Sequence, residues 1–183
     1  ASTPLFPSPN LTVAYVKDGD VWLWRQGSDP VALTTDGGVN DVWLSDDGAW
    51  VAFRRGLDLW AVSSNGQNEI QLTSESDFAN LDFGEELSPF VTGVLPYRVA
   101  WLPGSHVLLF NTSPQIEGPG LLLSDDLWQV NVETGELSLT LPSGEGGHFY
   151  LAPNGRRMAI VRPGRIDLAD IDGSNRREGL THT

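Results

Sequence analysis

The residue types that most often carry chemistry are few in this sequence, and their spacing does not favour catalysis. The three histidines, His106, His148 and His182, show no metal-ligand spacing to one another, and cysteine is absent. The sequence has no Gly-x-Ser-x-Gly elbow, no His-Glu-x-x-His motif and no phosphate-cradling glycine loop. We therefore expect a non-catalytic protein that has no catalytic residue, no cofactor and no metal site.

Several clusters of carboxylates could in principle bind calcium or transfer protons, but none has the complete sequence motif of such a site. Segments 18–20 (Asp-Gly-Asp) and 170–173 (Asp-Ile-Asp-Gly) resemble fragments of a calcium loop, which needs more acidic ligands and a distal glutamate. Aspartate and glycine at this spacing are typical of β-turns, and we prefer that interpretation. The acidic pairs at 85–86 and 125–126 are unremarkable in a chain with 24 acidic residues.

Composition excludes several classes of partner. The formal net charge is −13, whereas nucleic acids and anionic membranes select basic surfaces, so we expect no nucleic-acid partner. No run of about 18 apolar residues occurs, so we expect no membrane span. Twenty glycines and twelve prolines punctuate the chain every few residues, a pattern typical of an all-β protein.

A short motif, aspartate followed by an apolar residue and tryptophan, recurs along the chain. It begins at Asp20, Asp58 and Asp126, and a fainter copy without tryptophan begins at Asp167. Each copy is followed by a Leu-Thr pair, at 33–34, 72–73, 139–140 and 180–181. The copies lie about 40 residues apart, with one longer interval, and a fixed period of this size predicts a repeat architecture.

Each repeat predicts four short strands. In the second repeat they cover 40–44, 50–53, 58–63 and 69–73, and Asn65-Gly66 between the last two is a strong hairpin signal. The first repeat predicts strands at 3–6, 12–15, 20–24 and 30–34, the third at 98–102, 107–110, 126–131 and 137–141, and the fourth at 149–151, 158–160, 166–171 and 178–181. Four antiparallel strands in a meander form one propeller blade. We therefore predict a β-propeller of four four-stranded antiparallel blades, at about 1–34, 35–73, 74–140 and 141–183.

The second repeat carries the fullest version of the unit: Leu-Ser-Asp-Asp-Gly at 44–48, Asp-Leu-Trp-Ala-Val at 58–62 and Gln-Leu-Thr at 71–73. This unit resembles the repeat of TolB-type β-propellers, the WD-repeat-like blades of bacterial envelope proteins. The family's Asp-Gly-x-Asn turn matches 172–175, whereas its Ser-Pro-Asp-Gly turn is least well matched at 103–105. The resemblance covers essentially the whole chain and implies a periplasmic or extracellular location. It names no function, because this blade serves binding proteins, accessory domains and lipoproteins alike.

Two insertions, at 74–97 and 113–124, explain the longer interval. In a meander the connections that carry them lie at the same end of the blades, so we expect both insertions on one face. Aromatic and acidic residues interleave in them: Phe78, Asp82, Phe83, Glu85, Glu86, Phe90, Tyr97 and Glu117. Loops on a rigid scaffold often carry function, so we predict that this face binds a protein or peptide of basic character. The alternative is that the loops only pack on each other and cover the channel.

Two questions stay open at the level of sequence. The four blades could close as a small propeller, pair their open faces with a second copy as a homodimer, or belong to a longer chain. The function could also be that of an accessory propeller that gates a larger hydrolase of prolyl-oligopeptidase type, or of a carbohydrate-binding propeller that uses exposed tryptophan.

Overall fold

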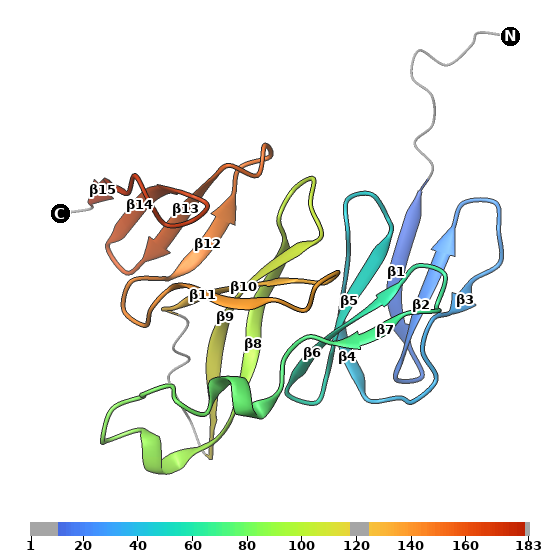
Figure 1. Cartoon of the computed structure of the whole chain (residues 1–183), viewed down its shortest axis with the longest axis horizontal. Coiled ribbons are helices and arrows are strands. Elements are labelled where there is room, and N and C mark those ends of the chain that lie inside the picture. The colour runs from blue at the N-terminus through green and yellow to red at the C-terminus, as the bar shows by residue number, and fades with distance from the viewer. Residues whose placement is uncertain (1–10, 118–124, 182–183) are drawn as a thin grey trace, which may run out of the picture.

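The structure is a computed structural model that describes residues 11–117 and 125–181. The described chain forms four antiparallel sheets in which sequential strands are neighbours (Figure 1). The first sheet contains β1 (Thr12–Lys17), β2 (Asp20–Arg25) and β3 (Val31–Ala32); the second contains β4 (Val39–Leu44), β5 (Trp50–Arg55), β6 (Asp58–Ser63) and β7 (Glu69–Gln71). The third contains β8 (Val91–Trp101), β9 (Val107–Ile116), β10 (Leu127–Asn131) and β11 (Leu137–Leu141); the fourth contains β12 (His148–Leu151), β13 (Arg157–Arg162), β14 (Arg165–Asp170) and β15 (Arg177–Thr181).

Each sheet is one blade of a β-propeller, so the predicted fold class is confirmed. The strand expected at 3–6, which would complete the first blade, lies outside the described residues. Two 3-10 helices, η1 (Glu75–Phe78) and η2 (Ser88–Phe90), interrupt the β structure between the second and third blades. In the part of the chain that the structure describes, neither helix has the length and hydropathy of a membrane span.

In the first two blades, the threonine of the Leu-Thr motif joins the end of the outermost strand to the neighbouring strand. Thr34 Oγ1 accepts a hydrogen bond from the Val21 amide at 3.0 Å, and it donates to Asp20 Oδ1 at 2.9 Å. In the second blade, Thr73 Oγ1 accepts the Leu59 amide at 2.9 Å. Both threonines are buried, so these bonds satisfy groups that water cannot reach. The motif is therefore structural.

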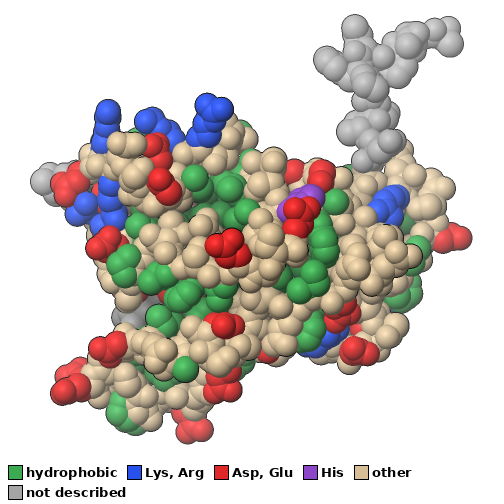
Figure 2. Space-filling view, viewed as in Figure 1, with side chains coloured by type: hydrophobic (Ala, Val, Ile, Leu, Met, Phe, Trp, Pro, Cys, Tyr) green, Lys and Arg blue, Asp and Glu red, His purple; other side chains and the backbone are tan. Residues whose placement is uncertain are grey.

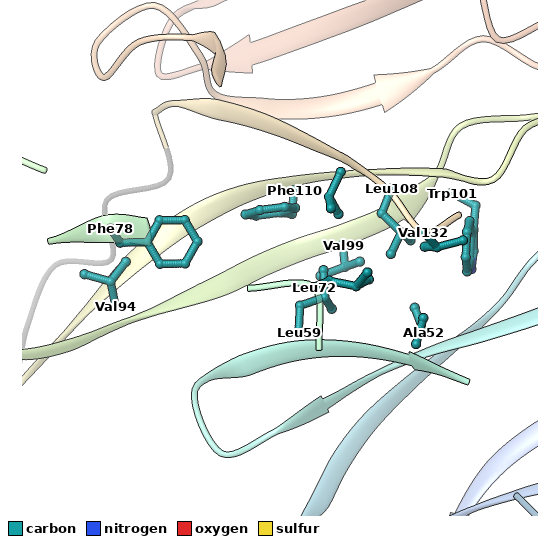
Figure 3. Packing of buried hydrophobic residues seen from close by; sticks show 12 residues of the cluster. Ala52, Leu59, Leu72, Phe78, Val94, Val99, Trp101, Leu108, Phe110 and Val132 are labelled. Atoms are coloured by element: carbon teal, nitrogen blue, oxygen red, sulfur yellow. The ribbon is translucent and has the colours of Figure 1, made fainter. Parts of the chain in front are cut away.

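Three hydrophobic clusters join the four blades in series. Val21, Leu23 and Phe53 belong to the cluster between the first and second blades. The second and third blades share the largest cluster, part of which is shown in Figure 3, and a third cluster joins the third and fourth blades. Among the described residues, no such cluster joins the fourth blade to the first, and the two lie at opposite ends of the arc in Figure 1. The described blades therefore form an open arc, not a closed ring.

Strand alternation decides which tryptophans lie between blades. Trp60 packs in the cluster between the first two blades and stacks on Phe53 with ring centroids 6.4 Å apart. Trp128 packs in the next cluster in the same way. Val21 and Leu23 face the second blade, so Trp22 lies on the opposite face of the first blade, where Lys17 Nζ sits 4.6 Å from its ring centroid. Trp60 and Trp128 thus fill gaps between neighbouring blades, and Trp22 does not.

The insertions contain strand that the sequence did not predict. β8 and β9 extend well beyond the expected 98–102 and 107–110 and pair with each other from Val91 opposite Ile116 to Trp101 opposite Leu108. Part of each insertion is therefore an elongated hairpin and not a loop, and the pairing places the two insertions side by side.

Candidate functional site

The elongated hairpin and the segment before it form a lobe that projects from one end of the blades. We define the insertion lobe as residues 74–97 and 111–117; it lies at the lower left of Figure 1, around the green helices. At its start, Asp77 Oδ2 accepts hydrogen bonds from the amide and hydroxyl of Ser74 at 2.6 and 2.9 Å. Further along, Asp82 Oδ1 accepts the Gly84 amide at 2.8 Å. These local bonds give the segment a defined course.

Phe78 anchors the lobe to the third blade. Its side chain is buried and contacts Phe110 and Trp128 edge to face, with ring centroids 6.2 and 5.5 Å apart. Figure 3 shows Phe78 and Val94 together at one end of the cluster between the second and third blades. Phe78 was predicted as a binding residue. Because its side chain is buried, most of its surface packs against the third blade and little of it can contact a ligand.

A hollow of about 330 Å³ lies between η1, the following turn and β8. Its apolar lining residues include Leu81, Phe83 and Val91, and its polar lining residues include Glu75 and Ser88. Phe83 is half-buried, which leaves part of its ring available to a bound group. The hollow therefore combines apolar surface with one carboxylate, that of Glu75.

The lobe is strongly acidic. Residues 74–97 carry five carboxylates and no lysine or arginine: Glu75, Asp77, Asp82, Glu85 and Glu86. Glu85 and Glu86 are exposed, and Figure 2 shows acidic side chains over the projecting lobe. Such a surface attracts cationic partners and repels anionic ones.

The other sequence-predicted site residues do not line the hollow. The Phe90 side chain is 61% exposed at the end of η2. Tyr97 is half-buried within β8, opposite Asn111, and Glu117 is exposed just after β9. The structure thus gathers the predicted residues in one lobe, with Phe83 alone among the exposed or half-buried ones in the wall of the hollow.

Asp126 is a buried carboxylate that sequence reasoning dismissed as one of many acidic residues. It accepts hydrogen bonds from the Thr112 amide at 2.7 Å, from the Thr112 hydroxyl, and from Trp128 Nε1 at 2.8 Å. Burial raises the pKa of Asp126, and these donors oppose that rise. Asp126 therefore fixes the base of the elongated hairpin to β10. Its place at the start of the repeated motif was the signal that could have identified it.

His106 links three turns at the opposite end of the blades. Its Nε2 lies 2.8 Å from Asp47 of the second blade, and its Nδ1 lies 2.8 Å from Glu133 of the third. The bonds to Glu133 and then Asp47 raise the pKa of His106. For Asp47, the Ala49 amide and then His106 lower the pKa to about 2. This cluster is an ion-pair bridge between two blades.

The fourth blade contains a buried carboxylate surrounded by arginines. Asp167, whose side chain is fully buried, accepts hydrogen bonds from Arg165 Nε at 2.6 Å, Arg162 Nη2 at 3.1 Å and Arg176 Nη2 at 2.6 Å. Burial raises the pKa of Asp167, but the three guanidinium groups outweigh that effect and hold it at about 2. Arg162 and Arg176 also donate to the carbonyls of Gly144 and Glu145, both at 2.7 Å, so the network ties this blade to the connection before it.

The described ranges contain no arrangement of side chains suited to a metal centre. In those ranges, no three histidine, aspartate or glutamate side chains converge as a metal site would require. One of the seven tryptophans, Trp101, is buried and the other six are half-buried, so none is fully exposed in the way that the carbohydrate-binding alternative expects. The insertion lobe is thus the strongest candidate for a binding site.

Comparisons with known proteins address the fold. No family model matches the sequence, and no curated protein matches it. Among solved structures, an oligogalacturonate lyase from Vibrio parahaemolyticus superposes with a TM-score of 0.63 at 20% identity, over 95% of this chain and 50% of that one. A putative TolB from Agrobacterium tumefaciens gives 0.52 at 17% identity, over 87% and 55%. Porphyromonas gingivalis dipeptidyl peptidase 4 gives 0.58 at 16% identity, over 82% and 26%.

At these identities the comparisons support the β-propeller fold alone. The chain spans 16% of the tricorn protease chain that it matches and 61% of a chain in a nidogen/laminin complex. The fold is therefore shared with proteins of different activities, and it assigns none of those activities to this chain.

Proposed function

We propose that this chain is a non-catalytic binding propeller that recognises a protein or peptide of basic character through the insertion lobe. The observation that carries the proposal is the hollow beside β8, with apolar walls at Leu81 and Phe83 inside an acidic segment without lysine or arginine. An apolar wall provides burial for an anchoring side chain, and the surrounding carboxylates select cationic flanks.

We further propose that the chain is of TolB type and works in the bacterial cell envelope or outside the cell. The recurring blade motifs and the structural similarity to a putative TolB support this placement. Fractionation of the native cells into cytoplasm, periplasm and medium, followed by immunoblotting with an antibody to this chain, tests it. Detection in the cytoplasm alone would overturn the location.

Peptide binding can be measured directly. A fluorescein-labelled peptide of alternating lysine and valine is the probe, and the corresponding glutamate–valine peptide is its charge-reversed control. We expect anisotropy titrations to show at least about tenfold tighter binding of the basic peptide, which corresponds to about 1.4 kcal/mol. Equal binding of the two peptides would remove the charge selection from the proposal.

A triple variant locates the binding to the lobe. Phe83→Ala with Glu85→Gln and Glu86→Gln should abolish binding of the basic peptide without lowering the melting temperature. The matched control is Leu139→Ala with Asp29→Asn and Asp36→Asn, which removes one exposed apolar side chain and two exposed carboxylates elsewhere. Binding that survives the lobe variant, or that is lost equally in the control, would contradict the proposed site.

A second candidate function is an accessory propeller that gates a larger hydrolase. Structural similarity to dipeptidyl peptidase 4 and to the tricorn protease favours it, because this chain covers only 26% and 16% of those chains. Immunoblotting of native cells gives the mass of the mature polypeptide. A polypeptide with about the mass of this chain, 19.9 kDa, would reject the accessory role, and a much larger one with peptidase activity would support it.

A further inference from the structure

The first half of β8 offers an unpaired backbone edge to the hollow. β8 is the last strand in its sheet, since the order is β11-β10-β9-β8, and so it has a hydrogen-bonded neighbour on one side only. Between Val91 and Tyr97 it pairs with β9 in the elongated hairpin. An edge strand of this kind presents a row of donors and acceptors that another extended chain can use.

The register shows which backbone groups face outward. Pro96 pairs with Thr112, yet the Pro96 carbonyl accepts Arg54 Nη1 at 3.3 Å and the Thr112 amide donates to Asp126. The backbone polar groups of these two residues therefore point away from each other's strand, which identifies a non-hydrogen-bonded pair. Alternation then makes Val94 opposite Pro114 the next such pair, which fits because proline has no amide hydrogen to donate.

It follows that the amide and carbonyl of Val94 point away from β9 and toward the hollow. Thr92, Gly93 and Val94 are among the residues that line it. The neighbouring residue Leu95 pairs with Ser113, so its backbone groups point toward β9. In the described residues, no backbone hydrogen bond from a loop or turn occupies Val94.

We propose that an extended peptide binds the insertion lobe by strand addition at β8, with an apolar side chain in the hollow and cationic side chains against the acidic segment. Main-chain hydrogen bonds to Val94 supply affinity and the hollow supplies specificity, as in other strand-addition complexes. Charge complementarity identifies the occupant as a basic segment, because residues 74–97 hold carboxylates and no cation. This inference rests on the proposed function and adds the geometry of recognition.

Amide hydrogen exchange, measured by NMR on the whole chain, tests strand addition. With the lysine–valine peptide at saturation, exchange of the Val94 amide should slow at least about tenfold. The Leu95 amide, which already faces β9, should be unaffected and serves as the internal control. The same peptide added to the Phe83/Glu85/Glu86 triple variant should leave Val94 unprotected.

The possible results separate the two proposals. If the peptide binds, and the lobe variant abolishes that binding, but Val94 exchange is unchanged, strand addition is overturned and the proposed function stands. If Val94 and Leu95 are slowed equally, the effect is general stabilisation, and strand addition is again overturned. If neither the basic peptide nor its glutamate control binds, both proposals are rejected.

Discussion

The hydroxyl of Thr73 accepts the backbone amide of Leu59 at 2.9 Å, and both residues are buried. Thr140, the threonine of the Leu-Thr pair in the third blade, has a buried hydroxyl with no hydrogen-bond partner among the described residues. It lies in a different register, because Trp128 pairs with Leu139 whereas Trp60 pairs with Gln71, two residues before Thr73. The same Leu-Thr motif therefore carries a satisfied hydroxyl in one blade and an unsatisfied one in another. The difference gives a pair of substitutions with opposite expected effects.

Thr73→Val should destabilise the protein, because it removes the acceptor and leaves the Leu59 amide buried without a partner. We expect a loss of about 1–3 kcal/mol in the free energy of unfolding. Thr140→Val is the matched control, and it should be neutral or slightly stabilising because no bond is lost. Urea unfolding of both variants measures this, and equal losses would contradict the structural role of the motif.

Asp167→Asn should lower the stability of the protein and reduce the dependence of its stability on pH in the acidic range. The pKa of Asp167 is lowered from 3.8 to about 2 in the folded state, so its contribution is present above about pH 4 and is lost as the pH falls toward 2. The shift corresponds to about 2 kcal/mol. Unfolding measured at pH 6 and at pH 2 should show a gap between wild type and variant that closes at the lower pH. Asp29→Asn, at an exposed residue, is the control, and a gap that persists at pH 2 would refute the account.

His106→Asn should lower stability in weakly acidic solution and have little effect in alkaline solution. The folded-state pKa of His106 is raised, so its ion pairs contribute below the unfolded value of 6.5 and are lost as the pH rises through the folded value. Melting temperatures across pH 5 to 9, at about one-unit steps, test this. NMR titration gives an independent check, because the pKa of His148 is lowered by partial burial and by Arg98, so His148 should titrate below His106. The reverse order would contradict the bridge.

Phe78→Ala and Phe90→Ala should have very different costs although both lie in the first insertion. Phe78 is buried against Phe110 and Trp128, so its truncation leaves a cavity and should cost about 3–5 kcal/mol. Phe90 is exposed, and its truncation should change stability by less than about 0.5 kcal/mol. Thermal unfolding of the two variants decides the matter. Similar small changes would mean that the lobe is not anchored to the third blade.

The repeat made most of the fold predictable from the sequence. β6 (Asp58–Ser63) has the bounds expected for its strand, because alternating apolar residues, the first aspartate and the following Asn-Gly turn all agree. The elongation of β8 and β9 was not predictable in the same way, since these segments have no counterpart in the other repeats and each contains a proline, Pro96 or Pro114. Both prolines are accommodated because each stands in a non-hydrogen-bonded pair, where its missing amide hydrogen breaks no bond between the strands.

The candidate site was predictable in its location and charge but not in its details. The interleaved aromatic and acidic residues identified the lobe. They did not show which of the aromatic side chains would be buried in the core and which would be exposed. Phe78 and Phe90 have the same side chain and lie in the same insertion, and the tertiary contacts show that the first is buried and the second exposed. The Val94 edge depended on strand register, which composition does not encode.

The distribution of ionic groups also has a kinetic consequence. Six of the eleven basic residues lie in or beside the fourth blade, between Arg156 and Arg177, and the lobe has none in residues 74–97. Figure 2 shows basic side chains over the fourth blade, with acidic ones beside them, and acidic side chains over the lobe. We expect such a molecule to have an electric dipole moment, which turns it in the field of a cationic ligand before they touch. Added salt should therefore slow its encounters with that ligand far more than it changes the lifetime of the complex.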